Sequence, residues 1–131
     1  MIRLTPISIA ATAQQYVVEV SEKLCKPFCI SNDLQPQGTI TFSVGRTQLV
    51  NGIAYIELIA NGNVVYHPKD SGCNSVVKQF NESVWVGFVG TSVPTIAITT
   101  TTPLQVASDI HCNTACGWSM IQSITITPTF A

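Results

Sequence analysis

Polar and apolar residues alternate one by one along several short stretches of the chain. In residues 39–44, with the sequence TITFSV, every second residue is apolar, as in a strand with one buried and one solvated face. No stretch carries a sustained apolar stripe with the 3.6-residue period of a helix. Strands are therefore predicted at residues 4–9, 16–20, 39–44, 46–50, 53–60, 63–67, 84–89, 95–101 and 121–127.

Two Asn-Gly dipeptides punctuate the middle of this pattern. Asn51-Gly52 and Asn61-Gly62 are the residue pair that best tolerates positive φ at both central positions of a type I′ turn. They predict a three-stranded antiparallel meander made of residues 46–50, 53–60 and 63–67. Helix is expected only as a short turn near residues 74–80 or 105–110.

About eight short strands without crossover helices indicate an all-β fold. Antiparallel sheets that pack face to face, as a β-sandwich or a jelly-roll-like arrangement, are the expected architecture. The chain shows no internal repeat and no linker, so residues 1–131 are predicted to form one domain.

Charge is scarce and balanced. Charged residues make up 10% of the chain, against about 25% in typical soluble domains, and the net charge is −1. Such a chain lacks the positive charge that nucleic-acid binding requires. Residues 83–108 contain no charge at all, but Gly87, Gly90, Pro94 and Pro103 argue against a helix that spans a membrane. We therefore expect this uncharged segment to be covered by another protein surface.

Five cysteines form two clusters and one isolated residue. Cys25 and Cys29, together with Cys112 and Cys116, have a spacing that allows a four-thiolate zinc site, with His111 as a substitute ligand. Two disulfides within or between these pairs are an equally plausible alternative, and they would leave Cys73 as the odd thiol. Buried free thiols are the third interpretation.

The first residues imitate a signal peptide only in part. Thr5, Pro6 and Ser8 interrupt the apolar stretch that follows Arg3, so the protein is expected to be made without a cleaved signal peptide. Synthesis in a reducing compartment would disfavour disulfides, unless the mature protein ends up outside a cell.

Signatures of enzymes are absent from the sequence. There is no Gly-x-Ser-x-Gly elbow, no phosphate-binding loop and no His-Glu-x-x-His motif. Asp109, His111 and Cys112 are the residue types of an activated nucleophile, but in an extended segment Cys112 points away from the other two. Glu57 lies in an apolar strand and is expected to be a paired charge. No catalytic residue, and no cofactor other than zinc, is therefore predicted.

The two tryptophans are the aromatic candidates for binding. Trp85 lies within an apolar strand and is expected in the core, whereas Trp118 follows the second cysteine pair and is expected to be more exposed. An exposed ring would suit a sugar-binding module.

Together these features favour a non-enzymatic structural protein that assembles with itself and with other subunits of a particle. The most concrete form of this hypothesis is a virion component, such as a phage-type capsid-decorating, head-fibre or tail protein. The alternative is a β-sandwich binding or adhesion module that recognises a glycan or another surface. Neither nucleic acid nor a membrane is an expected partner.

Overall fold

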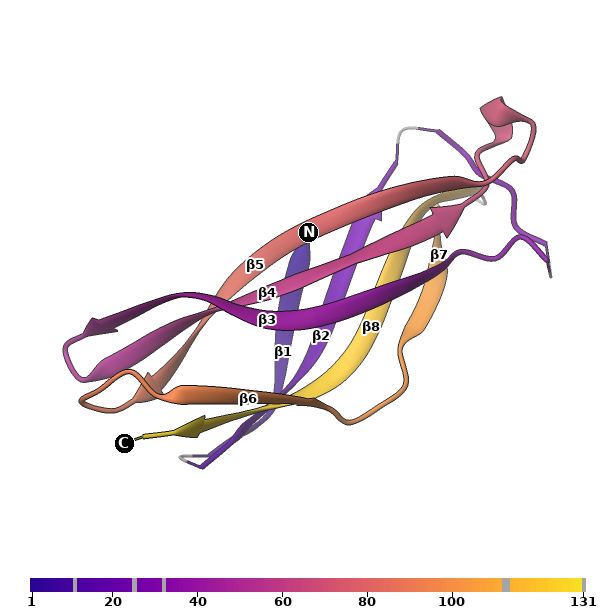
Figure 1. The fold of residues 1–131 in the computed structure, drawn as a ribbon. Helices are drawn as coiled ribbons and strands as arrows, with labels where there is room; N and C mark the ends of the chain where they lie inside the picture. Colours follow the sequence, from indigo (N-terminus) through magenta and orange to yellow (C-terminus); the bar gives the residue numbers. More distant parts are fainter. Residues whose placement is uncertain (11, 25, 32, 112–113, 131) are drawn as a thin grey trace.

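Eight antiparallel strands form two sheets that pack against each other (Figure 1). The computed structural model describes residues 1–10, 12–24, 26–31, 33–111 and 114–130. The larger sheet contains β1 (Ile2–Ile9), β2 (Gln14–Lys23), β8 (Thr114–Thr129), β6 (Thr95–Thr100) and β7 (Gln105–His111). The smaller sheet contains β3 (Gln37–Val50), β4 (Ile53–Tyr66) and β5 (Val76–Val89). A 3-10 turn, Lys69–Ser71, precedes β5, so the prediction of an all-β, sandwich-like fold is confirmed.

Strand β8 organises the larger sheet. One of its edges pairs with β2, and its other edge pairs with β7 near its beginning and with β6 near its end. Its inward residues are Trp118, Met120, Ile124 and Ile126, each 1% exposed or less. Each such side chain contributes roughly 1.5–3 kcal/mol of hydrophobic stabilisation, so β8 carries a large part of the core.

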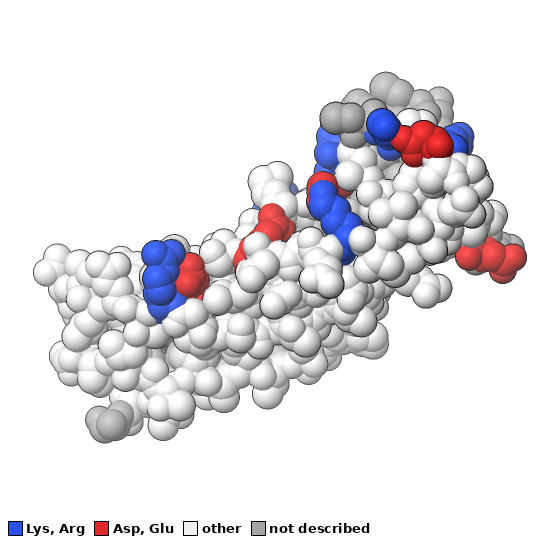
Figure 2. All heavy atoms as spheres, turned by 45° about the horizontal axis from the view of Figure 1, so that its top comes forward, with Lys and Arg blue, Asp and Glu red and all other residues white. Residues whose placement is uncertain are grey.

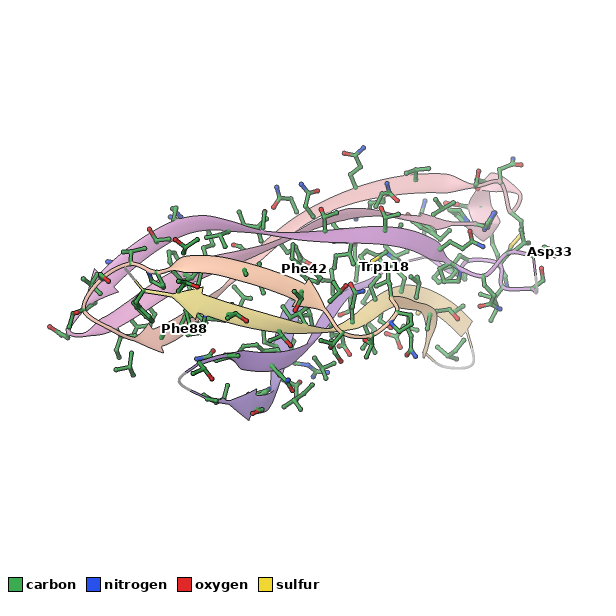
Figure 3. All side chains as sticks on the ribbon, turned by 60° about the horizontal axis from the view of Figure 1, so that its bottom comes forward. Asp33, Phe42, Phe88 and Trp118 are labelled. Carbon is green, nitrogen blue, oxygen red and sulfur yellow. A yellow bond between two sulfur atoms is a disulfide. The ribbon has the colours of Figure 1, made fainter. Side chains whose placement is uncertain are left out.

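The core fills the space between the two sheets. Trp118 packs on Phe80 of the opposite sheet, with 5.6 Å between the ring centroids. Figure 3 shows Trp118, Phe42 and Phe88 between the layers. Side chains on alternate positions of the central strands complete the core; among those that are 1% exposed or less are Val18, Val20, Ile56, Leu58 and Val64.

Only one of the two predicted Asn-Gly turns exists. Asn51 and Gly52 have φ values of 50° and 80° and connect β3 to β4, as expected for a type I′ turn. The prediction for Asn61-Gly62 was wrong, because both residues lie inside β4 and pair with β3 and β5 on its two sides. A Cβ atom at Gly62 would overlap the carbonyl oxygen of Thr39, so this glycine permits a close approach of two strands.

This correction changes the strands of the meander. Residues 39–44 and 46–50 form one strand, β3, with an irregular register between Val44 and Thr47. The predicted helical turns were also wrong: residues 76–80 begin β5, and residues 105–110 belong to β7. In each case pairing with a long neighbouring strand overrides the weak local preference for a turn.

The two tryptophans exchange their expected roles. Trp118 is 1% exposed, because it lies on the inner face of the central strand β8. Trp85 is 41% exposed, because it lies on the outer face of the smaller sheet, opposite Glu57. The alternation of side chains along a strand shows which residues share a face with each tryptophan. It does not show which of the two faces is buried, because that depends on how the two sheets pack.

A disulfide closes one end of the molecule. Cys29, in the connection from β2 to β3, is bonded to Cys73, just after the 3-10 turn, with 5.8 Å between their Cα atoms. The interpretation that Cys73 is the odd thiol was therefore wrong. The Cys29 amide also donates to the carbonyl oxygen of His67 at 2.7 Å, so this connection is held by the backbone as well.

Removal of this disulfide tests its contribution to stability. Because it closes a loop with a sequence separation of 44 residues, Cys29→Ser combined with Cys73→Ser is expected to lower the free energy of unfolding by about 2–4 kcal/mol. Urea unfolding measures this difference. Cys116→Ser, at a half-buried free cysteine, serves as the control with an expected loss below about 1 kcal/mol. Equal losses in both variants would contradict a stabilising role of the bridge.

Candidate interaction surface

Most charged side chains neutralise one another within the molecule. The described residues contain four side-chain ion pairs: Arg3 with Glu19, Lys26 with Asp70, Arg46 with Glu57, and Lys78 with Glu22. Figure 2 shows these charges as separate clusters, and the left-hand end of the face it displays is uncharged. The surface therefore has one end that is almost free of charge.

The uncharged end is built from three chain segments. The β3–β4 turn meets the end of β5, where the Gly90 amide donates to the carbonyl oxygen of Gly52 at 2.9 Å. The end of β8 lies beside the start of β6, with Thr129 paired to Thr95. A Cβ atom at Gly90 would overlap the ring of Phe130, so the chain end packs against the β5–β6 connection.

Apolar side chains are exposed on this end. Val89 is 88% exposed, the largest exposure among the large apolar side chains of the described residues. We call the group the apolar tip; its members are Leu49, Val50, Val89, Val93 and Phe130. Contiguous exposed apolar residues with no charge among them are typical of interaction surfaces.

A cleft of about 330 Å³ extends the apolar tip toward the β1–β2 hairpin. In its wall the Gln14 side-chain amide donates to the carbonyl oxygen of Gly87 at 2.9 Å, and the Tyr16 hydroxyl donates to the Gln14 side-chain oxygen. Burial raises the pKa of Tyr16, so its hydroxyl remains a neutral donor. No charged residue lines the cleft, whose walls are Ile9, Ala10, Gln14, Gly87, Phe88 and Val89.

The charge-free segment 83–108 does not form one face. Its first part is the end of β5 in the smaller sheet, whereas its later part forms β6 and most of β7 in the larger sheet. Ile96 and Ile98 point inward and pack against the core. The sequence predicted that residues 83–108 form one uncharged surface. In the structure, the uncharged end of the molecule contains only part of this segment, together with the β3–β4 turn and the end of β8.

Glu57 is a buried and fully paired carboxylate, as expected from the sequence. The backbone amide of Arg46 donates a hydrogen bond to Oε1 of Glu57 at 3.1 Å, and the guanidinium Nη2 of Arg46 donates one to Oε2 at 3.0 Å. These hydrogen bonds lower the pKa of Glu57 to about 2. The same guanidinium lies 5.4 Å from the centroid of the Trp85 ring, so the outer face of the smaller sheet carries a mixed aromatic and charged cluster.

The predicted zinc ligands are only partly within the described residues. Cys25 and Cys112 lie outside them, Cys29 is bonded to Cys73, and Cys116 is half-buried at the start of β8. A zinc site on all four cysteines would require Cys29 to be reduced. In the described part of the chain, no group of three or more His, Cys, Asp and Glu residues is placed to hold a metal ion. The zinc site stays a prediction.

The structure does not test whether Asp109, His111 and Cys112 form an activated nucleophile. Asp109 is exposed in β7, opposite Gly117, while the His111 side chain and Cys112 lie outside the described residues. The other histidine, His67, uses its carbonyl oxygen as an acceptor, and its Nδ1 atom has no hydrogen-bond partner among the described residues.

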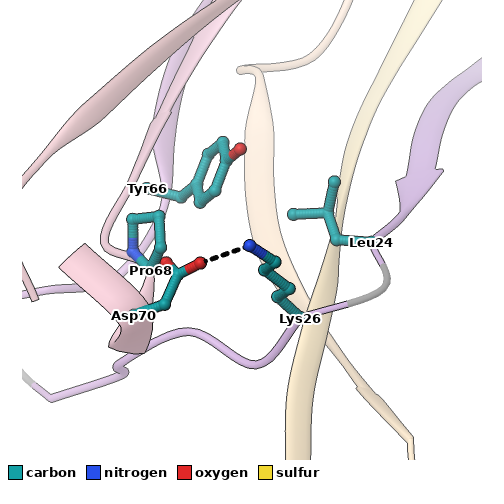
Figure 4. A pocket seen from close by; sticks show the side chains of 5 residues that line it. All are labelled: Leu24, Lys26, Tyr66, Pro68 and Asp70. Atoms are coloured by element: carbon teal, nitrogen blue, oxygen red, sulfur yellow. Dashed lines mark hydrogen bonds and ion pairs between the residues drawn. The ribbon is translucent and has the colours of Figure 1, made fainter.

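A second concavity, of about 280 Å³, lies near the disulfide (Figure 4). Its two charged residues, Lys26 and Asp70, form an ion pair of 2.7 Å, which lowers the pKa of Asp70 and raises that of Lys26. Leu24, Tyr66 and Pro68 complete the wall. Because the charges satisfy each other, this pocket offers a ligand few free polar groups.

Comparison with known proteins gives no match, whether with protein-family models, curated proteins or solved structures. Across the described residues, no helix is long and apolar enough to cross a membrane.

The ion pair between the buried Glu57 carboxylate and the exposed Arg46 side chain predicts a dependence of stability on pH. The pKa of Glu57 falls from 4.5 to about 2 on folding, so its ionised form stabilises the native state above pH 4.5 and this contribution is lost as pH falls toward 2. Glu57→Gln is therefore expected to lower the midpoint temperature of thermal unfolding at pH 7. The difference in this temperature between the variant and the parent should become smaller at pH 2. Thermal unfolding at both pH values measures it.

The exposed pair of Arg3 and Glu19 provides the control for this experiment. The Glu19 side chain is 29% exposed, against 10% for that of Glu57, so Glu19→Gln should change stability by less than about 1 kcal/mol at pH 7. An equal effect of Glu57→Gln at pH 2 and at pH 7 would show that the substitution acts through packing instead of charge.

Proposed function

We propose that this protein is a non-enzymatic structural subunit that assembles with copies of itself and with other subunits of a larger particle. The apolar tip is the observation that carries this proposal. A virion is the most concrete setting, with the chain as a phage-type capsid-decorating, head-fibre or tail component. The protein would then act within the assembled particle.

Burial of the apolar tip is the driving force for assembly. Each Å² of apolar surface removed from water contributes roughly 25 cal/mol, and each of the five residues of the tip is at least 36% exposed. Covering the tip requires no desolvation of charge, because no Lys, Arg, Asp or Glu belongs to it. A protein surface that is also apolar is therefore the best partner.

The chemistry of the tip also argues against other partners. Phosphate groups of nucleic acid, and the headgroups of anionic lipids, bind to clusters of Lys and Arg. The tip has no such cluster, and four of the six Lys and Arg side chains in the chain are paired with carboxylates. Another subunit, identical or different, fits this surface better.

Trp85 supports a second candidate, a module that binds a glycan. Trp85 is 41% exposed on the outer face of the smaller sheet. On the same face the ring of Tyr55 lies 3.4 Å from the position that a Cβ atom of Gly87 would occupy. Two neighbouring rings on an open sheet can stack on the apolar faces of sugars, and Arg46 beside them can donate hydrogen bonds to hydroxyl groups.

The assembly proposal is tested by placing a charge on the tip. Val89→Lys introduces an ammonium group where the proposed contact buries a valine, so the mass of the assembly measured by native mass spectrometry is expected to fall. Val77→Lys is a matched control, since Val77 is 61% exposed on the same face of β5 but at the opposite end of the strand.

Three results separate the possibilities. A smaller species for Val89→Lys alone supports the proposed interface. An unchanged mass for both variants means that the tip is not an interface. A parent protein that is monomeric at micromolar concentration rejects assembly with itself.

The glycan candidate makes a separate prediction. If Trp85 stacks on a sugar, Trp85→Ala should weaken binding to an immobilised neutral glycan by about ten-fold, while Val77→Ala should leave it unchanged. Absence of binding by the parent protein across a glycan array would rule this candidate out.

A further inference from the structure

Five strands have an edge without a partner in the described residues. They are β1, β6 and β7 in the larger sheet, and β3 and β5 in the smaller sheet. The backbone amide and carbonyl groups of such an edge can pair with a strand from another molecule. Natural proteins therefore protect exposed edges with prolines, charges, bulges or short strands.

Four of these edges carry such protection. β1 contains Pro6, where its register with β2 is irregular, and β6 is only six residues long. β7 carries the exposed carboxylate of Asp109. β5 carries Lys78 and Glu82, whose side chains form ion pairs with Glu22 and with the amino-terminal ammonium group.

The far end of β5 is protected in another way. The carbonyl oxygen of Gly87 accepts a hydrogen bond from the Gln14 side chain, so part of the edge is already occupied. This side chain takes the place that a pairing strand would use. A second molecule would have to displace it before it could extend the sheet at β5.

The edge of β3 has none of these devices between residues 38 and 44. This stretch contains no proline and no charged residue, and its register with β4 is regular. Arg46, the one charged residue of β3, lies beyond it at the bulge and is paired with Glu57. In Figure 1, β3 lies at the margin of the smaller sheet.

We propose that residues 38–44 of β3 pair with the same residues of a second copy of this chain, antiparallel and about a two-fold axis. This inference rests on the proposed function, because it specifies one contact of the assembly. The three strands of each copy would then form one continuous sheet.

Charge and shape favour a second copy as the partner. With the axis at Thr41, each Thr41 faces its equivalent, and Ile40 faces Phe42 of the other copy. No charge meets a like charge in this register, and β-branched and aromatic residues form the cross-strand pairs, as stable sheets prefer. The pairing also covers Ile40 and Phe42, which are only half-buried in the single chain.

Two different contacts would let the chain build a particle. A two-fold contact through β3 uses the same patch on both copies and stops at a pair. The apolar tip lies at the far end of the same sheet and remains available to join one pair to other subunits. Removal of the tip contact alone should therefore release pairs instead of single chains.

Opposite charges at the axis provide the test. Thr41 is exposed, so Thr41→Lys and Thr41→Glu should leave the fold intact, which circular dichroism verifies. Each is made in the Val89→Lys background, where the tip contact is removed. We expect Val89→Lys to be a pair, each double variant to be a single chain with at least ~10-fold weaker pairing, and an equimolar mixture of the two double variants to form mixed pairs.

Asn81→Lys in the same background is the matched control. Thr41 of β3 pairs with Asn61 of β4, which in turn pairs with Asn81 of β5. Asn81 is also exposed, but it lies on the opposite edge strand of the same sheet. It should leave the pair intact. Formation of mixed pairs by the Thr41→Lys and Thr41→Glu variants would show that the two residues at position 41 meet at the axis. If either variant had lost its pairing because it was unfolded, mixing the two could not restore the pair.

The outcomes distinguish this inference from the proposed function. If the parent assembles but Val89→Lys is already a single chain, the β3 contact is refuted while assembly through the tip stands. Pairs that persist in both Thr41 variants refute it as well. If Val89→Lys keeps the parent's mass, the tip assignment fails, and Thr41→Lys made in the parent must still lower the mass for the β3 contact to hold.

Discussion

The pairing of β8 on both of its edges is the interaction on which the rest of the fold depends. β2 covers one edge, and β6 and β7 share the other, so most backbone groups of this long strand are satisfied within the sheet. Its inner face supplies Trp118 and Met120 to the core. Because β8 is fixed on both sides, the smaller sheet has a rigid layer on which to pack.

The molecule has two unlike ends. Near the disulfide, the Cys29–Cys73 bridge and the Lys26–Asp70 ion pair tie the connections of the two sheets together. At the other end the chain offers apolar side chains and almost no charge, and Val89 is the most exposed of them. One end is thus stabilised internally, while the other leaves apolar surface that a partner can bury.

Ion pairs within the chain have a consequence for the surface. Arg46 and Glu57 neutralise each other beside Trp85, so the outer face of the smaller sheet repels a neighbouring molecule only weakly. The unprotected edge of β3 lies next to this face. Few charges and one open edge together describe a subunit whose sheet can be continued by another, whereas the same features on a free monomer would favour aggregation.

The alternation of residues by itself determined that this chain is made of antiparallel strands, because each strand has to place apolar side chains on one face. It also located the turn at Asn51-Gly52, whose conformational preference is local. Only the tertiary structure decided that Asn61-Gly62 lies inside β4, that Trp118 is buried and Trp85 exposed, and that Cys29 pairs with Cys73. These features depend on contacts between segments that are far apart in the sequence, and a period-two pattern contains no information about which strand, or which face, its partner will meet.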